Sequence, residues 1–133
     1  MGAKSNRKGK TGEREIVNIL KEHGFHAERS AQYCGKSPDS ADVITDIPGL
    51  HIEVKRTETL SLYTAMGQAE RDASYAREPK VPVVFHRRSG KDWLAILSLE
   101  DFLHFFKIRK ACQEIIKQHD LRKTNEPSGN SGS

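Results

Sequence analysis

The chain has 133 residues, enough for one domain with an ordinary core, and its net charge of +4 (pI about 9.1) suits a polyanionic partner without requiring one. It contains no apolar run long enough to span a membrane and no signal-peptide pattern, so an integral membrane protein is not expected and the cytoplasm is favoured. The two cysteines have no CxxC or Cys/His spacing, which argues against a structural zinc site and fits a reducing compartment.

The two ends of the chain are expected to lie outside the packed core. The first ten residues contain no acid and four cations, which are Lys4, Arg7, Lys8 and Lys10. Residues 122–133 are rich in Ser, Gly, Asn and Pro and contain no apolar residue. Neither segment buries enough apolar surface to offset the entropy of ordering. We therefore predict a flexible basic arm over 1–10, a single domain over 11–121 and a disordered tail over 122–133.

Between these ends, the first half of the chain predicts one helix followed by three strands. A helical apolar stripe runs over 12–23 and ends at Gly24. Residues 25–31 predict a short strand, and the Gly- and Pro-containing stretch 32–40 predicts a loop. Two further strands, 42–45 and 51–56, are joined by a turn at Pro48-Gly49.

The second half predicts a helix, two strands and a last helix. An Ala-rich stripe marks a helix over 61–76, and residues 81–86 and 93–97 predict strands. Ser98 and Asp101 have the spacing of a capping box that opens a helix continuing past Ile108. The order α-β-β-β-α-β-β-α predicts an α/β fold, with a mixed sheet flanked by helices.

The chemically informative residues lie on the two strands around Pro48-Gly49. Glu53 and Lys55 point to the same face of their strand, although such a pair is a solvated ion pair in most proteins. The turn folds Asp42 back alongside Glu53 or Lys55, and two carboxylates held together repel unless a cation lies between them. Oxygen-rich ligand sets suit Mg²⁺ or Mn²⁺, so the pattern predicts a divalent metal site.

The first predicted helix contributes a third carboxylate. Glu13 lies about 40° from the centre of the apolar stripe and Glu15 about 120° away, so Glu13 is expected to point inward and Glu15 toward solvent. A first-turn acid that favours the helix dipole is the alternative for Glu13. In the metal hypothesis, Asp42 and Glu53 hold the ion on a phosphate, Lys55 orients water or stabilises developing charge, and Glu13 completes the metal shell directly or through water. One ion is preferred, and a second is left open.

An ordered set of motifs resembles the archaeal-type Holliday junction resolvases and their phage relatives, within the PD-(D/E)xK nuclease superfamily. The set consists of Gly12-Glu13-Arg14-Glu15, Arg29-Ser30, Asp42-Val43 and Ile52-Glu53-Val54-Lys55. The resemblance, over roughly residues 8–106, implies a restriction-endonuclease-like fold and a Mg²⁺-dependent homodimer that nicks both sides of a four-way DNA junction. It places Glu13, Asp42, Glu53 and Lys55 on the catalytic positions.

The same resemblance places Arg14 and Arg29 near the DNA phosphates, and the basic residues Lys8, Lys10 and Lys36 are further candidates for that role. Solvated surface positions explain these side chains equally well. Gln68 could support Lys55 or the attacking water, although exposed helix glutamines are common. His51 shares the face of Glu53 and could border the site or be an ordinary surface residue.

Several alternatives stay open at this point. The Pro38-Asp39 pair makes Asp39 a rival of Asp42, which is preferred because it begins an apolar strand. Ile108, Ile115 and Ile116 are candidates for the dimer surface, because two coordinated nicks need two active sites. A general nicking, flap or restriction-type nuclease would share every catalytic residue. A non-catalytic basic DNA-binding module would use the carboxylates only structurally.

Overall fold

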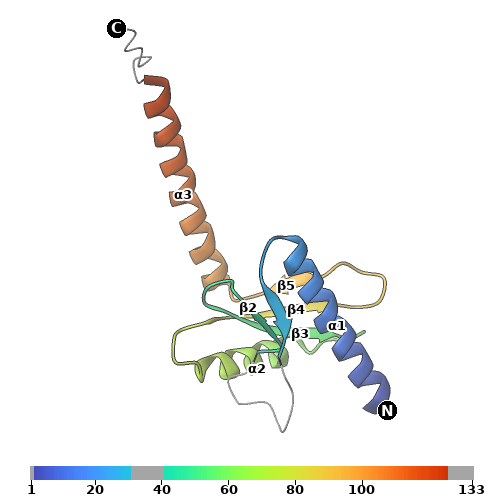
Figure 1. The fold of residues 1–133 in the computed structure, drawn as a ribbon. Coiled ribbons are helices and arrows are strands. Elements are labelled where there is room, and N and C mark those ends of the chain that lie inside the picture. Colours follow the sequence, from blue (N-terminus) through green and yellow to red (C-terminus); the bar gives the residue numbers. More distant parts are fainter. Residues whose placement is uncertain (1, 31–40, 126–133) are drawn as a thin grey trace. The chain divides into compact units, whose positions relative to one another are not determined.

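The computed structural model describes residues 2–30 and 41–125, and it contains the expected order α-β-β-β-α-β-β-α (Figure 1). Lys36 and Asp39 lie outside the described residues. The elements are α1 (Gly2–Glu22), β1 (Ala27–Arg29), β2 (Val43–Thr45), β3 (Leu50–Arg56), α2 (Leu62–Ser74), β4 (Val81–Arg87), β5 (Leu94–Ile96) and α3 (Leu99–Asn125). They divide into two compact units, Met1–Leu97 and Ser98–Ser133.

The first unit is built on a mixed five-stranded sheet in the order β1-β2-β3-β4-β5. Strands β3 and β4 run parallel, with Leu50 opposite Val81 and Arg56 opposite Arg87, and the other neighbours are antiparallel. A parallel pair cannot be joined by a tight turn, so the chain crosses between these two strands through α2. The predicted mixed sheet flanked by helices is confirmed.

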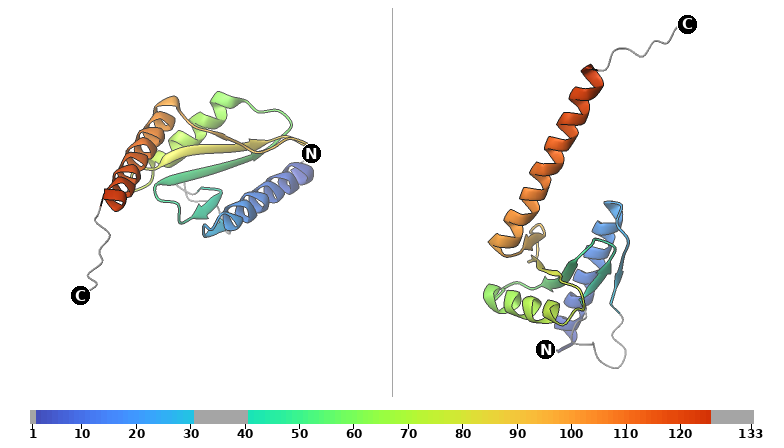
Figure 2. Two further views of the ribbon diagram at one scale, coloured as in Figure 1. Left: turned by 90° about the horizontal axis from the view of Figure 1, so that it is seen from above. Right: turned by 90° about the vertical axis from the view of Figure 1, so that its left-hand side faces the viewer.

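Helices α1 and α2 cover opposite faces of this sheet (Figure 2). The first face packs Ile16, Val17 and Leu20 of α1 on inward-facing strand residues such as Ile52 and Val54. The second face packs small and flexible side chains of α2 against β4, with Ala65, Met66 and Ala69 around Val84. Because strand side chains alternate between faces, the residues of β3 at odd positions lie on the α2 side.

The N-terminal boundary of α1 differs from the prediction. Residues 2–10 form the first turns of the helix, so the helix start expected at 12 is wrong. The sequence offers no proline between Gly2 and Glu22, and extending a helix that is already nucleated costs little for Lys- and Arg-rich residues. Residues 2–10 therefore continue a helix that is anchored further along the chain.

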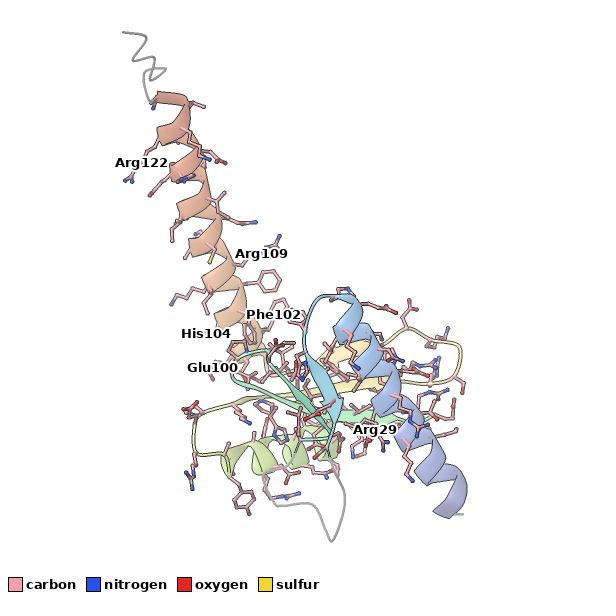
Figure 3. The ribbon with its side chains drawn as sticks, viewed as in Figure 1. Arg29, Glu100, Phe102, His104, Arg109 and Arg122 are labelled. Carbon is pink, nitrogen blue, oxygen red and sulfur yellow. The ribbon has the colours of Figure 1, made fainter. Side chains whose placement is uncertain are left out.

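Helix α3 constitutes the second unit, so the single domain predicted over 11–121 is divided at Ser98. The predicted cap is confirmed, because Ser98 Oγ accepts a hydrogen bond from the Asp101 N–H at 3.1 Å. The helix continues to Asn125, past the expected tail boundary at 122. Its side chains project on all sides and none of its residues is buried (Figure 3). None of the helices described is long and apolar enough to cross a bilayer.

Candidate functional site

Strand β3 carries a row of polar side chains on the face covered by α2. His51, Glu53 and Lys55 alternate with the apolar residues that face α1. His51 and Glu53 are 1% and 2% exposed, and Lys55 is half-buried. Buried polar groups need hydrogen-bond or ionic partners, and His51 Nε2 lies 3.0 Å from Glu53 Oε1. The row is therefore a polar strip within an otherwise apolar core, and α2 covers it.

Helix α2 presents polar side chains to this strip at a matching spacing. Lys55 Nζ donates a hydrogen bond to Gln68 Oε1 at 3.3 Å, which is the contact expected for a supporting glutamine. Four residues further along the helix, Asp72 lies beside His51 and Glu53. Two residues along the strand and four residues along the helix each span about 6 to 7 Å. A helix that runs antiparallel to the strand can therefore place Gln68 at Lys55 and Asp72 at Glu53.

Asp42 is placed directly beside the Glu53–Lys55 segment. Its backbone N–H donates to the Ile52 carbonyl at 2.9 Å, and its Oδ2 accepts a hydrogen bond from the Val54 N–H at 2.8 Å. In the described ladder of β2 and β3, Val43 pairs with Ile52, and Asp42 lies just before this pair. The carboxylate thus takes over a backbone acceptor position between Glu53 and Lys55, and the predicted proximity of Asp42 to this pair is confirmed.

Glu13 points inward as predicted, and its partner is Arg29. Its side chain is nearly buried on α1, and its Oε2 lies 2.9 Å from Nε of Arg29 on β1. Within the described residues, the group of three ligands close enough to share an ion is His51, Glu53 and Asp72. Glu13 is not part of this group, and Arg29 holds it in an ion pair.

The donor set around Glu53 fits a divalent cation. It combines buried carboxylates with an imidazole that has a ring nitrogen, Nδ1, buried and without a hydrogen-bond partner among the described residues. Carboxylate oxygens are the ligands of Mg²⁺ and Mn²⁺, and Mn²⁺ also accepts imidazole nitrogen. An ammonium group, Lys55, stands two residues away on the same face. This combination is the chemistry that metal-assisted phosphodiester hydrolysis requires.

Comparison with known proteins places the chain in a family. A family model described as archaeal Holliday junction resolvase (Hjc) matches residues 4–126. The chain belongs to the archaeal Holliday junction resolvase family. The crystal structure of Hjc from Archaeoglobus fulgidus, a Holliday junction resolvase from an archaeal hyperthermophile, is similar with a TM-score of 0.52 and 26% identity, over 64% of this chain and 72% of that one. Among curated protein sequences no match is found.

Four of the basic residues expected to meet DNA lie on α1 and β1 of this Hjc-family chain, and Lys36 lies outside the described residues. Lys8, Lys10 and Arg14 are exposed on α1. Lys8 Nζ lies 3.2 Å from Glu58 Oε1, so its charge is partly compensated. Hydrogen bonds from Ser89 and then from Lys8 lower the pKa of Glu58 to about 2. Lys10 and Arg14 thus remain the more available cations of this helix for a phosphate backbone.

One expectation for α1 is wrong in this family member. Glu15 does not face solvent, because the β4–β5 hairpin lies over that side of the helix. Arg87 Nε and Nη2 donate to the two oxygens of Glu15 at 2.8 and 2.9 Å, and Trp93 Nε1 donates at 2.9 Å. The hydrogen bond from Arg87 is the main cause of a lowered Glu15 pKa. The two-pronged hydrogen bond between Arg87 and Glu15 links α1 to β4, and the bond from Trp93 holds the indole against the same carboxylate.

Sequence reasoning also missed a residue that the structure places beside His51 and Glu53. Asp72 was not singled out as a ligand, because it lies 19 positions after Glu53 and an acid on a predicted surface helix is common. The available signal was its position four residues after Gln68, which puts both on one side of α2. His51 was noted for sharing the face of Glu53, and the structure shows it fully buried against that residue.

Proposed function

We propose that this chain resolves four-way DNA junctions by metal-dependent hydrolysis of phosphodiester bonds, with Glu53, Asp42 and Lys55 at the reaction centre. Membership of the archaeal Holliday junction resolvase family supports the substrate. The observation that carries the assignment of the centre is the hydrogen bond from the Val54 N–H to Asp42, which fixes a carboxylate between Glu53 and Lys55. Catalysis by positioned charges depends on such rigid placement.

Asp42 and Glu53 would hold Mg²⁺, for which Mn²⁺ is a substitute. A divalent ion there supplies Lewis-acid chemistry, lowering the pKa of a water and neutralising charge on the phosphate. The two carboxylates are 8% and 2% exposed, so the protein surrounds them with little bulk water. Their contribution is to orient the phosphate and to keep the hydrolytic water in a defined position.

Lys55 would act on the reacting phosphate or on the attacking water. Its side chain is half-buried, and its ammonium donates a hydrogen bond to Gln68 Oε1 at 3.3 Å. A carbonyl acceptor fixes the position of the ammonium without neutralising its charge. Lys55 is thus placed to stabilise the developing oxyanion, and Gln68 acts as a positioning residue through it.

Glu13 would act through Arg29 and through water. The ion pair between them is partly buried, and the Arg29 side chain is 29% exposed, so part of the guanidinium remains accessible. A guanidinium held in place by a carboxylate is well suited to bind a DNA phosphate. Arg14, Lys8, Lys10 and Lys36 complete the proposed phosphate contacts; Lys36 is proposed from the sequence alone, because it lies outside the described residues.

The chain would work as a homodimer, since paired nicks need two active sites and each chain supplies one. Support comes from α3, where Ile108, Ile115 and Ile116 are 48%, 65% and 60% exposed. Exposed apolar side chains of this size are a common feature of interaction surfaces. The alternative of a general nicking or flap nuclease shares the same centre and differs in the DNA that it binds.

The deciding experiment compares cleavage of a synthetic four-way junction, a flap and a linear duplex, each with Mg²⁺, Mn²⁺ or Ca²⁺. The proposal expects paired nicks in the junction with Mg²⁺ or Mn²⁺ and little cutting of the duplex. Asp42→Asn and Glu53→Gln should remove cleavage while junction binding remains. Equal cutting of flap or duplex would favour the general nuclease. Absence of any cutting, with both variants behaving as wild type, would favour the non-catalytic DNA-binding module.

A further inference from the structure

A group of three metal-ligating side chains lies on the α2 side of β3, next to the proposed Asp42 centre. His51 and Glu53 come from the strand and Asp72 from the helix, and their ligand atoms lie within 4.8 Å of one another. In an octahedral site with bonds of about 2.1 Å, neighbouring ligands are about 3.0 Å apart and opposite ligands about 4.2 Å apart. His51 Nε2 and Glu53 Oε1 are 3.0 Å apart. The group therefore has roughly the dimensions of one coordination sphere.

The imidazole of His51 is held in the core with one ring nitrogen unsatisfied. The side chain is 0% exposed. One ring nitrogen contacts Glu53, and the other, Nδ1, is buried with no hydrogen-bond partner in the described part of the chain. A neutral imidazole has one donor and one acceptor, and leaving either unsatisfied in a core costs about 1–3 kcal/mol. The nitrogen that faces Glu53, Nε2, is the one available to an ion shared with that carboxylate.

The charges of the group point the same way. Glu53 and Asp72 bring two carboxylates close together, and like charges at this separation disfavour the ionised pair unless a cation lies near. No hydrogen bond or ion pair joins the Asp72 side chain to the residues that the structure describes. Ala69 and Ala73, both buried on α2, bring the helix close enough for Asp72 to reach the strand. The close approach thus places an acid where a cation would stabilise it.

We propose that His51, Glu53 and Asp72 bind a second divalent cation, with Glu53 shared between this ion and the one assigned to Asp42. A ligand set of one imidazole nitrogen and two carboxylates suits Mn²⁺ better than Mg²⁺, which prefers oxygen ligands alone. This deepens the proposed function, because two ions on either side of Glu53 would both act on one phosphate. Binding of the second ion itself does not require DNA or cleavage.

The test measures Mn²⁺ binding to the full chain by calorimetry and the environment of the bound Mn²⁺ by pulsed electron paramagnetic resonance. Coupling to a ¹⁴N nucleus reports a histidine ligand, which an all-carboxylate site lacks. Wild type should bind two ions per chain and show this coupling. Asp42→Asn should weaken one ion and retain the coupling. His51→Gln should remove the coupling, and Asp72→Asn, which keeps the shape of the side chain, should weaken the second ion at least about 10-fold.

Glu70→Gln is the matched control, because Glu70 is an exposed acid on the same helix, and it should leave both ions unchanged. A wild-type protein that binds Mn²⁺ without ¹⁴N coupling overturns the inference, as does an Asp72→Asn variant that binds like Glu70→Gln. Junction cleavage is scored separately. Cleavage by wild type with no histidine-bound ion leaves the proposed function standing, whereas a histidine-bound ion without any cleavage refutes that function and keeps the ion site.

Discussion

Substitution of Gly12 by alanine tests the close packing of α1 on β3. A Cβ atom at this position would lie 2.7 Å from Arg56 Cβ, 3.3 Å from Val54 Cγ1 and 3.4 Å from Trp93 Cη2. The nearest atom is attached directly to the backbone of β3 and cannot move as the end of a flexible side chain can. The helix would have to shift away from the strand by several tenths of an ångström to restore an ordinary contact.

The expected magnitude follows from two opposing effects. Alanine is about 1 kcal/mol better than glycine inside a helix, whereas overpacking of a tight contact costs about 1–3 kcal/mol. Because the contact involves a backbone-anchored atom, we expect the cost to be about 2–3 kcal/mol and the net destabilisation about 1–2 kcal/mol. For a unit of this size, each kcal/mol corresponds to about 4–8 °C in Tm.

Thermal and urea unfolding of Gly12→Ala and Gly9→Ala provide the assay. Gly9 lies on the same helix with nothing within 4 Å of an added Cβ, so its replacement should stabilise by up to about 1 kcal/mol. Junction cleavage by Gly12→Ala should also fall, because Glu13 follows directly and small misplacements of an active-site group can cost about 100-fold. A Gly12→Ala protein as stable as Gly9→Ala would show that α1 does not pack on β3 as described.

Three further predictions follow from the charged residues. Lys55→Ala should abolish junction cleavage and leave junction binding within a few-fold of wild type in a mobility-shift assay; loss of binding as well would contradict a catalytic lysine. Glu15→Gln should lower the free energy of unfolding by about 1 kcal/mol at neutral pH. Because the pKa of Glu15 is lowered in the folded protein, its stabilising contribution is present above the ordinary value of 4.5 and is lost as the pH falls through the lower folded value. The unfolding curves of variant and wild type should therefore converge in acid. Lys10→Ala should weaken junction binding and reduce its salt slope by about one, and an unchanged slope would exclude that side chain as a phosphate contact.

The parts of the fold set by local periodicity were predictable. Every helix and strand was expected in its order, because apolar spacing of 3.6 or 2 residues is a property of each segment alone. The inward direction of Glu13 followed from its angle to the apolar stripe, and the closeness of Asp42 to Glu53 followed from the Pro48-Gly49 turn. The contact between Lys55 and Gln68 also matched the expectation.

The errors arose where the boundary of a helix or the partner of a side chain depends on residues far away in the sequence. The start of α1 at Gly2 was missed because glycine, serine and lysine composition gives no start signal there, whereas a helix extends cooperatively from a packed turn. Glu15 was expected in solvent because helical periodicity describes one apolar face and does not reveal a second neighbour. Arg87 and Trp93, more than 70 positions later, cover that side.

The sequence by itself therefore determined which side chains share a face: His51, Glu53 and Lys55 on one side of a strand, and Gln68 and Asp72 on one side of a helix. Only the tertiary structure decided that these two faces meet. The crossover between the parallel strands β3 and β4 lays α2 over the polar strip rather than over the apolar side. The face that α2 covers depends on the handedness of the whole βαβ connection, which no single segment of the sequence determines.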